Sequence, residues 1–445
     1  MLKRKIDLFL EEWKKNPNRK PLIVSGARQI GKTTSIGEFG KTYASYIEIN
    51  FFLEPKYKGI FNNGFEVSEV IKELSLLNPN VNIIPHDTLI LFDEIQSFPD
   101  AVTSLKSFAL DKRFDVICSG SLLDVNYKHI TSIPVGFKEE YVMSSLDFEE
   151  FLWARGYNEN HIEMLFDNMK KMIPLSSNVM ETFNKLFDEY LFCGGLPEAV
   201  DSFAREKNFI NVFKIQKRIH KDYEDDITKY VEGLDATRVL KLYRHITSQL
   251  SKENHKFQFT KLGHGARFRD FIGCEDWLKN AGIINLAYKL NSLELPLKGN
   301  EDMNSYKIYY ADTSLLVSDF DEEASEDLRI NKNFGIYNGA IYESMIGEAL
   351  VKQGYDLFYY RSNGSLVELD FIIRVKNYIV PIEVKSSKGR TKSLNNILNE
   401  DNKLKYSIKL SKNNIGYENN RFTFPYFLTF LLKRFFKETN YISWE

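Results

Sequence analysis

The sequence predicts a multi-domain α/β protein whose first domain is built on a parallel sheet. Over residues 1–150, short apolar runs typical of buried strands alternate with helical segments, as a parallel sheet with helical crossovers requires. From Phe148 to about Leu250 the apolar residues recur at helical spacing, and strand patterns return further on. A chain of 445 residues is too long for one hydrophobic core. At roughly 150 residues per domain, we expect about three domains.

The first predicted strand, Pro21–Val24, leads directly into a glycine-rich loop. Residues 26–33 read Gly-Ala-Arg-Gln-Ile-Gly-Lys-Thr and fit the pattern G-x-x-x-x-G-K-[ST]. Glycines let successive backbone N–H groups surround phosphate oxygens, and the following helix adds its positive N-terminus. We therefore expect ATP to bind here, with Lys32 on the β and γ phosphates and Thr33 holding Mg²⁺. The expected nucleotide-binding residues are Gly26, Ala27, Arg28, Gln29, Ile30, Gly31, Lys32, Thr33 and Thr34.

A second predicted strand ends in two carboxylates. After Thr88, residues 89–92 are an apolar run typical of a strand that is covered on both faces, and Asp93 and Glu94 follow it. Asp93 can reach the Mg²⁺ shell, and Glu94 is placed to act as the base for an attacking water. Taken alone, the run is equally compatible with a buried strand whose acidic end is only solvated. The glycine-rich loop upstream favours the nucleotide site.

A third predicted strand, residues 114–118, runs into a polar corner at Ser119, Gly120 and Ser121. Either serine could sense the γ phosphate, and we take Ser121 as a candidate catalytic residue together with Glu94 and Lys32. Small hydroxyl residues at a strand end are also common turn formers, so a purely structural role stays open.

Together these three motifs resemble those of prokaryotic AAA-like ATPases that carry a C-terminal domain of unknown function. The resemblance continues through residues 146–152, 194–199 and 382–385, and so covers nearly the whole chain. It implies three parts: a P-loop ATPase core (1–150), a helical lid with a winged-helix-like region (151–330), and a module similar to the PD-(D/E)xK restriction-endonuclease fold (331–445).

The chain departs from this family at one position. Members often carry Gly-Arg after the third strand, whereas this chain has Gly136-Phe137. An arginine supplied to the γ phosphate accelerates phosphoryl transfer by about 10³ or more. We therefore expect slow turnover, or an arginine that comes from elsewhere in the chain or from a partner. By sequence the nearest candidates are Arg28, Arg113 and Arg155, each of which is also compatible with a solvated surface charge.

The middle region contains two patterns of interest. Residues 194–197, Gly-Gly-Leu-Pro, indicate a tight turn between helices or a lid contact over the nucleotide. A predicted helix near residues 270–280 and strands at 283–288 and 306–310 are typical of a winged helix, which would contact DNA. Nearby positive residues are compatible with DNA contact or with a solvated face: Lys261, His264, Arg267 and Arg269.

The C-terminal module contains a helix followed by two strands with acidic residues. Asp370 lies on the first strand, and Glu383 and Lys385 lie on the second. Alternation places residues i and i+2 of a strand on one face. The resemblance implies that Asp370 and Glu383 ligate Mg²⁺ while Lys385 activates water, with Glu343 of the helix as a further acid. A charged sheet face, or a binding domain without cleavage, would show the same pattern.

Composition limits the remaining options. The 59 Lys+Arg and 61 Asp+Glu residues give a net charge of −2, so any DNA contact needs a local basic patch. Cys118, Cys193 and Cys274 are too far apart for a disulfide framework or a zinc site. The longest apolar run, 424–432, is far shorter than the ~20 residues that cross a bilayer, and no signal peptide is recognised. We expect a cytoplasmic protein without membrane contact.

Two functional classes stay open. One is an ATPase that acts on or near DNA through its winged-helix and nuclease-like regions. The other is a nucleotide-controlled interaction switch with a catalytically silent nuclease-like domain, whose partner is another protein or a second copy of the chain.

Overall fold

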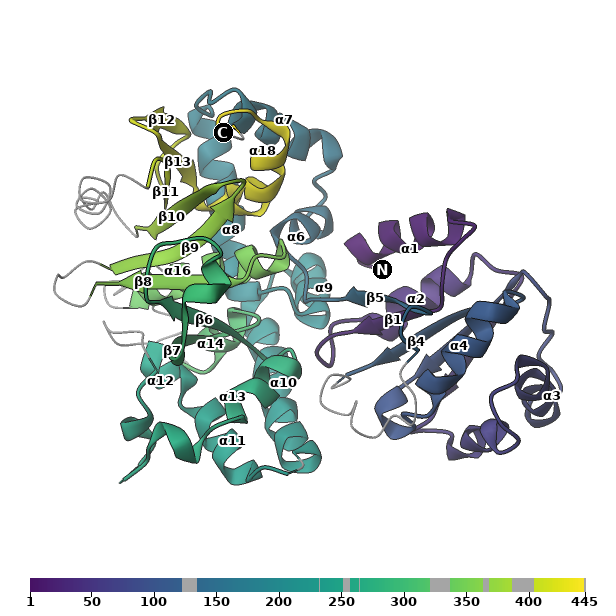
Figure 1. Cartoon of the computed structure of the whole chain (residues 1–445). Coiled ribbons are helices and arrows are strands. Elements are labelled where there is room, and N and C mark those ends of the chain that lie inside the picture. The colour runs from purple at the N-terminus through teal and green to yellow at the C-terminus, as the bar shows by residue number, and fades with distance from the viewer. Residues whose placement is uncertain are drawn as a thin grey trace. The chain divides into compact units, whose positions relative to one another are not determined.

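The computed structural model divides into two compact units (Figure 1). One unit consists of residues 1–145 with 280–282, and the other of residues 146–279 with 283–445. Within the described residues, no helix combines the length and apolar character needed to span a membrane. The structure describes residues 1–121, 134–231, 233–250, 257–263, 265–320, 337–362, 368–385 and 404–443.

The first unit contains a five-stranded sheet in which every neighbouring pair is parallel. Its order is β2-β3-β4-β1-β5, so β4 lies between β1 and β3. Since the carboxyl ends of parallel strands meet at one edge, the loops after β1, β3 and β4 are neighbours. The strands are β1 (Leu22–Ser25), β2 (Ser45–Asn50), β3 (Thr88–Asp93), β4 (Asp115–Gly120) and β5 (Glu139–Val142).

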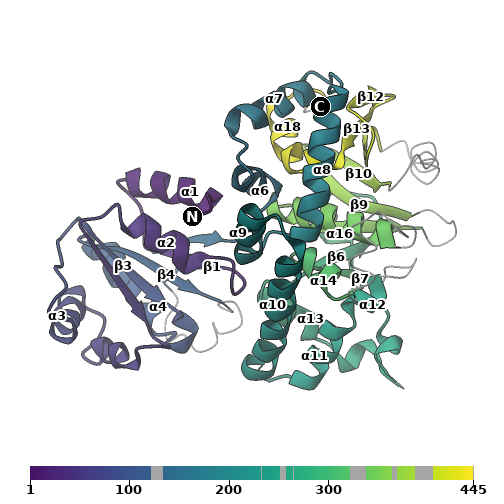
Figure 2. The same cartoon turned by 180° about the vertical axis from the view of Figure 1, so that it is seen from behind.

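Helices cover both faces of this sheet (Figures 1 and 2). On β3, Ile90 and Phe92 pack into one apolar cluster, and Leu89 and Leu91 into the cluster on the opposite face. This is the physical reason for the unbroken apolar run, because a strand buried on both faces has no solvent side. One face is covered by α1 (Lys5–Lys15) and α2 (Lys32–Gly40), and the other by α3 (Val67–Leu77), α4 (Ala101–Asp111) and the 3₁₀ segment η1 (Pro55–Phe61).

The second unit begins with helices, as the apolar spacing predicted. The first of them starts at a capping box, in which Asp147 accepts from Glu150 N at 2.9 Å and Glu150 accepts from Asp147 N at 3.0 Å. The helices are α6 (Phe148–Ala154), α7 (Glu159–Lys170), α8 (Ser177–Cys193), α9 (Pro197–Glu206), α10 (Phe209–Tyr230), α11 (Ala236–Arg244), α12 (Ile246–Leu250), α13 (Cys274–Asn280) and α14 (Ser314–Ser318).

The same unit contains a mixed eight-stranded sheet of order β12-β13-β11-β10-β9-β8-β6-β7. Helix α16 (Tyr337–Lys352) contacts β6, β7, β8 and β10 of this sheet, and η7 (Tyr426–Leu431) with α18 (Leu432–Glu438) follows its last strand. The strands are β6 (Ile284–Leu290), β7 (Glu301–Tyr310), β8 (Leu357–Arg361), β9 (Glu368–Val375), β10 (Tyr378–Val384), β11 (Ser407–Ser411), β12 (Gly416–Glu418) and β13 (Arg421–Pro425).

Strands β6 and β7 correct one expectation. We expected them to form the wing of a separate winged helix, but β6 pairs in parallel with β8, with Ala287 opposite Leu357. Both strands therefore extend the C-terminal sheet. Local patterning identifies a strand but not its partner, and this partner comes much later in the chain. Of the basic residues noted nearby, His264 lies outside the described residues. Arg269 Nε lies 3.9 Å from Asp270 Oδ1.

Candidate nucleotide-binding site

The glycine-rich loop joins β1 to α2. Gly31 is the N-cap of α2 with a φ of 89°, and Gly26 has a φ of 141°. A Cβ on Gly26 would lie 2.2 Å from Met143 O, so no other residue fits this turn without moving the backbone. The N–H groups of the first turn of α2 precede its i→i−4 hydrogen bonds, which leaves them available to a phosphate.

Lys32 lies within the curve of the loop. Its Nζ donates to Gly26 O at 2.9 Å and to Ala27 O at 2.7 Å, and the residue is only 9% exposed. Burial lowers the pKa of Lys32 to about 8, although the nearby carboxylates of Glu94 and Asp93 oppose the shift. The ammonium group therefore lies at the loop carbonyls, and Asp93 at the end of β3 and Glu94 after it favour its positive charge. Thr34, in the first turn of α2, is exposed.

Arg4 holds the glycine-rich loop by hydrogen bonds, a role that the sequence did not indicate. It is 5% exposed and precedes α1. Its guanidinium donates to Ile30 O at 2.9 Å and to Ser144 O at 2.7 Å. The loop is thereby joined to the segment after β5, whose partner strand is β1. A single arginine near the amino terminus carries no motif, so only the fold reveals it.

Asp93 is the last residue of β3, and its carboxylate accepts hydrogen bonds from three polar side chains. Thr33 Oγ1 donates to Asp93 Oδ2 at 3.2 Å, and Asn50 Nδ2 donates to the same oxygen at 3.2 Å. Ser119 Oγ donates to Asp93 Oδ1. Thr33 and Asp93, both expected at Mg²⁺, are thus in direct contact, and Ser119 rather than Ser121 reaches the carboxylate. Asn50, at the end of β2, was not expected.

Glu94 belongs to a second group of contacts. Its backbone is left-handed, with a φ of 54°, and Gln96 Nε2 donates to Glu94 Oε2. The same amide nitrogen lies 3.5 Å from Ser121 Oγ, which also accepts from Arg28 Nε at 3.1 Å. Gln96 Oε1 is buried and has no partner among the described residues. Gln96 therefore connects the expected base with the expected sensor.

The three candidate arginines differ in their surroundings. Arg113 forms an ion pair with Asp111 at 2.7 Å, and Arg155 forms one with Glu189. Arg28 contacts Ser121 and lies in the glycine-rich loop itself. Arg28 is therefore next to the expected phosphate position.

The strands of the C-terminal module bring Asp370 and Glu383 together. In the antiparallel register of β9 and β10, Ile382 lies opposite Phe371, so the next pair is Glu383 with Asp370. Directly opposed residues project to the same face. Val384 N donates to Asp370 Oδ2 at 2.7 Å, and Lys385 Nζ lies 2.7 Å from Glu383 Oε1.

Glu343 of α16 lies near this pair but is held by a lysine. Lys307 Nζ lies 2.9 Å from Glu343 Oε1 and 2.8 Å from Glu368 Oε1, and Tyr309 OH donates to Glu343 Oε1 at 2.5 Å. Burial and the negative charge of Glu343 raise the pKa of Asp370 to about 7. Among the described residues, no group of three or more His, Cys, Asp or Glu is arranged to hold a metal ion. Lys307 and Glu368 were not expected.

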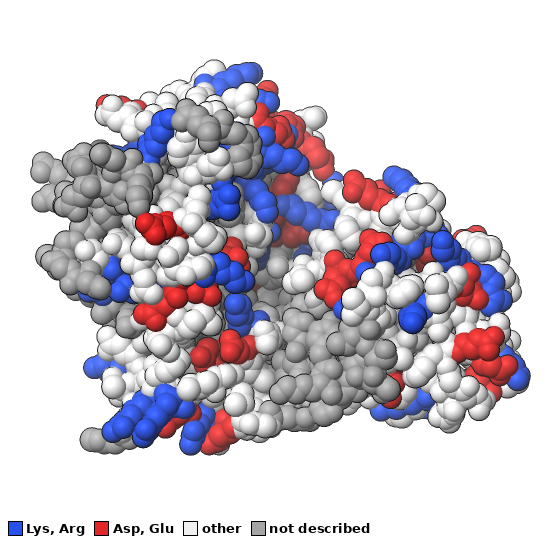
Figure 3. Space-filling view, viewed as in Figure 1, with Lys and Arg blue, Asp and Glu red and all other residues white. Residues whose placement is uncertain are grey.

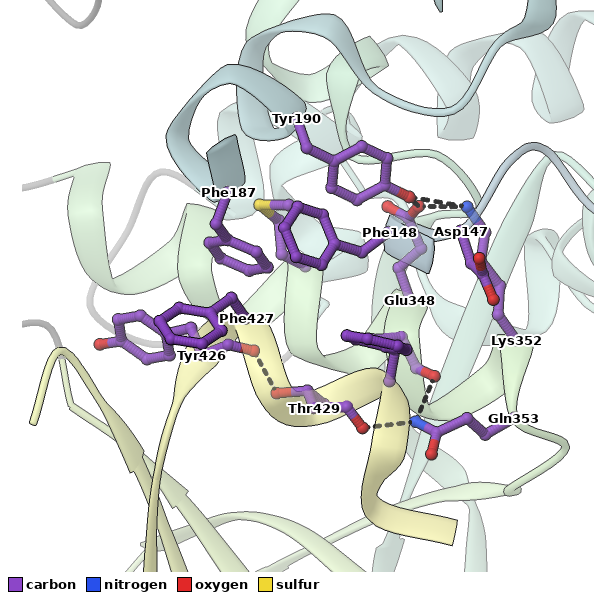
Figure 4. Close-up of a pocket in the computed structure, with 13 residues that line it drawn as sticks. Asp147, Phe148, Phe187, Tyr190, Glu348, Lys352, Gln353, Tyr426, Phe427 and Thr429 are labelled. Carbon is purple, nitrogen blue, oxygen red and sulfur yellow. Dashed lines mark hydrogen bonds and ion pairs between the residues drawn. The ribbon is translucent and has the colours of Figure 1, made fainter. Parts of the chain in front are cut away.

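A pocket in the second unit contains a satisfied charge network (Figure 4). Glu348 and Lys352 of α16 form a buried ion pair, and Glu348 Oε2 accepts from Thr313 N at 2.7 Å. Tyr190 OH and Lys352 Nζ donate to Leu146 O at 2.7 and 2.9 Å. Since each charge has partners, the network serves to hold Leu146 in place.

The Gly194-Gly195 turn also contacts Leu146. Leu146 N donates to Gly195 O at 2.7 Å, and Gly195 N donates to Asp312 Oδ2 at 2.9 Å. A Cβ on Gly195 would lie 2.0 Å from Leu146 O. These contacts support a tight turn, which was one of the two expected roles of this glycine pair.

Three segments of the chain match family models. Residues 18–152 match an AAA domain, so this segment is similar to AAA-like P-loop ATPase domains. Residues 184–325 match a domain of unknown function (DUF8612), and residues 338–427 match another (DUF4143). A search of curated proteins found no match.

Solved structures that align with this chain include nucleotide-binding proteins. The Walker-type ATPase paby2304 of Pyrococcus abyssi is 15% identical, with 72% of this chain and 96% of that chain covered and a TM-score of 0.43. The Aeropyrum pernix Orc1 protein in complex with DNA is 13% identical, with 75% and 94% covered and a TM-score of 0.30. AMPPCP-bound DnaA from Aquifex aeolicus is 12% identical, with 61% and 86% covered and a TM-score of 0.26.

Proposed function

We propose that the first unit binds ATP with Mg²⁺ and hydrolyses it at the carboxyl edge of its sheet. The observation that carries this proposal is the direct contact between Thr33 of the loop and Asp93 of β3, with Lys32 and Glu94 beside them. These four side chains come from the start of α2 and from the carboxyl end of β3 with the residue after it, which the parallel sheet brings to one edge. They are the groups that phosphoryl transfer requires for phosphate, metal and water.

Each group has its own task. Lys32 exchanges its contacts with loop carbonyls for phosphate oxygens, and the N-terminus of α2 adds backbone donors. Thr33 and Asp93 provide the oxygen atoms that suit a hard divalent cation. Bound Mg²⁺ would neutralise charge that develops on the phosphates. Glu94 orients the attacking water and accepts its proton, and Ser121 positions Arg28 towards the phosphates.

Calorimetry tests the binding step. Lys32→Ala removes the main phosphate contact, so ATP binding should be lost. Lys41→Ala is the matched control, because Lys41 is exposed near the end of the same helix and pairs only locally with Glu38, at 2.6 Å. Equal ATP affinity in the Lys32→Ala variant and the wild type would place nucleotide binding elsewhere.

The C-terminal module is our second candidate site. The cross-strand pairing of Asp370 with Glu383, and the contact between Glu383 and Lys385, support a PD-(D/E)xK-like arrangement that holds one divalent cation and acts on DNA. Plasmid nicking in the presence of Mg²⁺, abolished by Asp370→Ala, tests it. If wild-type protein leaves plasmid intact, the module is a binding domain in a nucleotide-controlled switch, whose partner is a protein or a second copy of the chain.

A cytoplasmic location is consistent with the cysteines. Cys118, Cys193 and Cys274 are unpaired and buried, as suits a reducing compartment. Cell fractionation tests this location.

A further inference from the structure

We propose that Lys307 is the built-in cation of the C-terminal acidic cluster, so that the cluster accepts one divalent cation, between Asp370 and Glu383, and Glu343 is not a metal ligand. The cation at Asp370 and Glu383 rests on the function proposed above. The role of Lys307 does not, because it follows from contacts of Lys307 itself.

The ammonium group of Lys307 already occupies the position where Glu343 could offer an oxygen. It lies 2.9 Å from Glu343 Oε1 and 2.8 Å from Glu368 Oε1, and the residue is 1% exposed. Tyr309 OH donates to the same oxygen of Glu343. Moving a metal ion onto this oxygen would displace both donors and leave a buried ammonium with one fewer acceptor. Removing one of the two carboxylates that pair with a buried ammonium group is unfavourable.

Charge balance gives the same answer. The cluster has four carboxylates, Glu343, Glu368, Asp370 and Glu383, and three cations, Lys307, Lys385 and Arg361, the last 3.9 Å from Glu368. One formal negative charge remains, and one divalent cation is already enough to neutralise it. A second one would create a large excess of positive charge beside Lys307.

Glu383 offers a buried oxygen atom that a cation could use. Glu383 is 1% exposed, and its Oε2 is buried without a hydrogen-bond partner among the described residues. Its other oxygen, Oε1, is used by Lys385. An unsatisfied buried carboxylate oxygen is costly unless a cation or donor reaches it. The position next to Glu383 Oε2 is therefore where one cation fits.

The test is a titration of nucleotide-free full-length protein with Mn²⁺, followed by calorimetry and electron paramagnetic resonance. Lys307→Met keeps the side-chain stem and removes the charge, so this variant should bind one more Mn²⁺ per chain than the wild type. Glu343→Gln preserves the shape and leaves Lys307 paired with Glu368. Its Mn²⁺ affinity should equal that of the wild type. Any weak binding at the glycine-rich loop is common to all variants and cancels in these differences.

The outcomes separate the two proposals. Loss of one Mn²⁺ in Asp370→Asn supports the proposed metal site, and no loss refutes that site alone. An unchanged Mn²⁺ count in a folded Lys307→Met variant overturns the role of Lys307. If that variant does not fold, Glu343→Gln decides, because a tenfold or greater loss of affinity would make Glu343 a ligand and overturn the inference.

Discussion

Replacing Arg4 by methionine tests how the glycine-rich loop is held. Methionine keeps an apolar side chain but donates no hydrogen bond to Ile30 O or Ser144 O. A hydrogen bond from a charged group contributes about 1.5–3 kcal/mol, and the bond to Ile30 is buried whereas that to Ser144 is only partly buried. Since water can replace part of the second bond, we expect the first unit to lose about 2–4 kcal/mol of unfolding free energy.

Hydrogen exchange of peptides from β1 and α2 measures this loss within the first unit, which a global transition of a two-unit chain does not isolate. The matched control is Lys15→Met, since Lys15 is exposed on α1 and should cost less than about 0.5 kcal/mol. We also expect ATP to bind about tenfold more weakly to Arg4→Met, because binding must then order the loop. If both variants lose the same protection, Arg4 does not brace the loop and the reasoning fails.

Three further predictions concern the candidate nucleotide-binding site and the Gly195 turn of the second unit. Glu94→Gln should bind ATP like the wild type and hydrolyse it about 10²–10⁴-fold more slowly in a phosphate-release assay, because the amide cannot accept the proton of water. ATP affinity should fall as the pH rises through about 8, the pKa of buried Lys32, because a neutral amine no longer attracts phosphate. Gly195→Ala should cost several kcal/mol (~3 or more) in urea unfolding, since its Cβ would lie 2.0 Å from Leu146 O.

Each of these has a control and a contrary outcome. Glu38→Gln, on the exposed end of α2, should leave hydrolysis unchanged, and wild-type turnover in Glu94→Gln would mean another base. Lys32→Arg keeps its charge at all these pH values, so a fall of its ATP affinity at the same pH would exclude Lys32 as the titrating group. Gly339→Ala has open space around its Cβ and should be neutral or stabilising; a similarly mild Gly195→Ala would show that Leu146 can move.

The local geometry of the candidate nucleotide-binding site was largely predictable because its signals are local. Backbone conformation at Gly26 and Gly31, the first turn of α2 and the double-sided burial of β3 all follow from neighbouring residues in the chain. Predicting the contact of Thr33 with Asp93 required one further inference, namely that β1 and β3 lie in one parallel sheet. The order of that sheet, with β4 between β1 and β3, was not predictable from these patterns.

The residues that sequence reasoning missed are those whose partners lie far away in the chain. Arg4 contacts Ser144, Asn50 contacts Asp93, and Lys307 contacts Glu343. None of them belongs to a motif, since a lone arginine, asparagine or lysine is usually solvated on a surface. Their roles depend on burial, which local sequence does not define.

By itself the sequence determined the local features of this protein: a glycine-rich loop that fits a phosphate-binding pattern, a strand followed by two acids, Asp93 and Glu94, and strands with Asp370, Glu383 and Lys385. The tertiary structure alone decided which of these groups meet, and that β6 and β7 belong to the C-terminal sheet. It also placed Lys307 among the acids there. The physical reason is that hydrogen bonding and side-chain periodicity act between near neighbours, whereas strand pairing and buried ion pairs join segments that only the folded chain brings together.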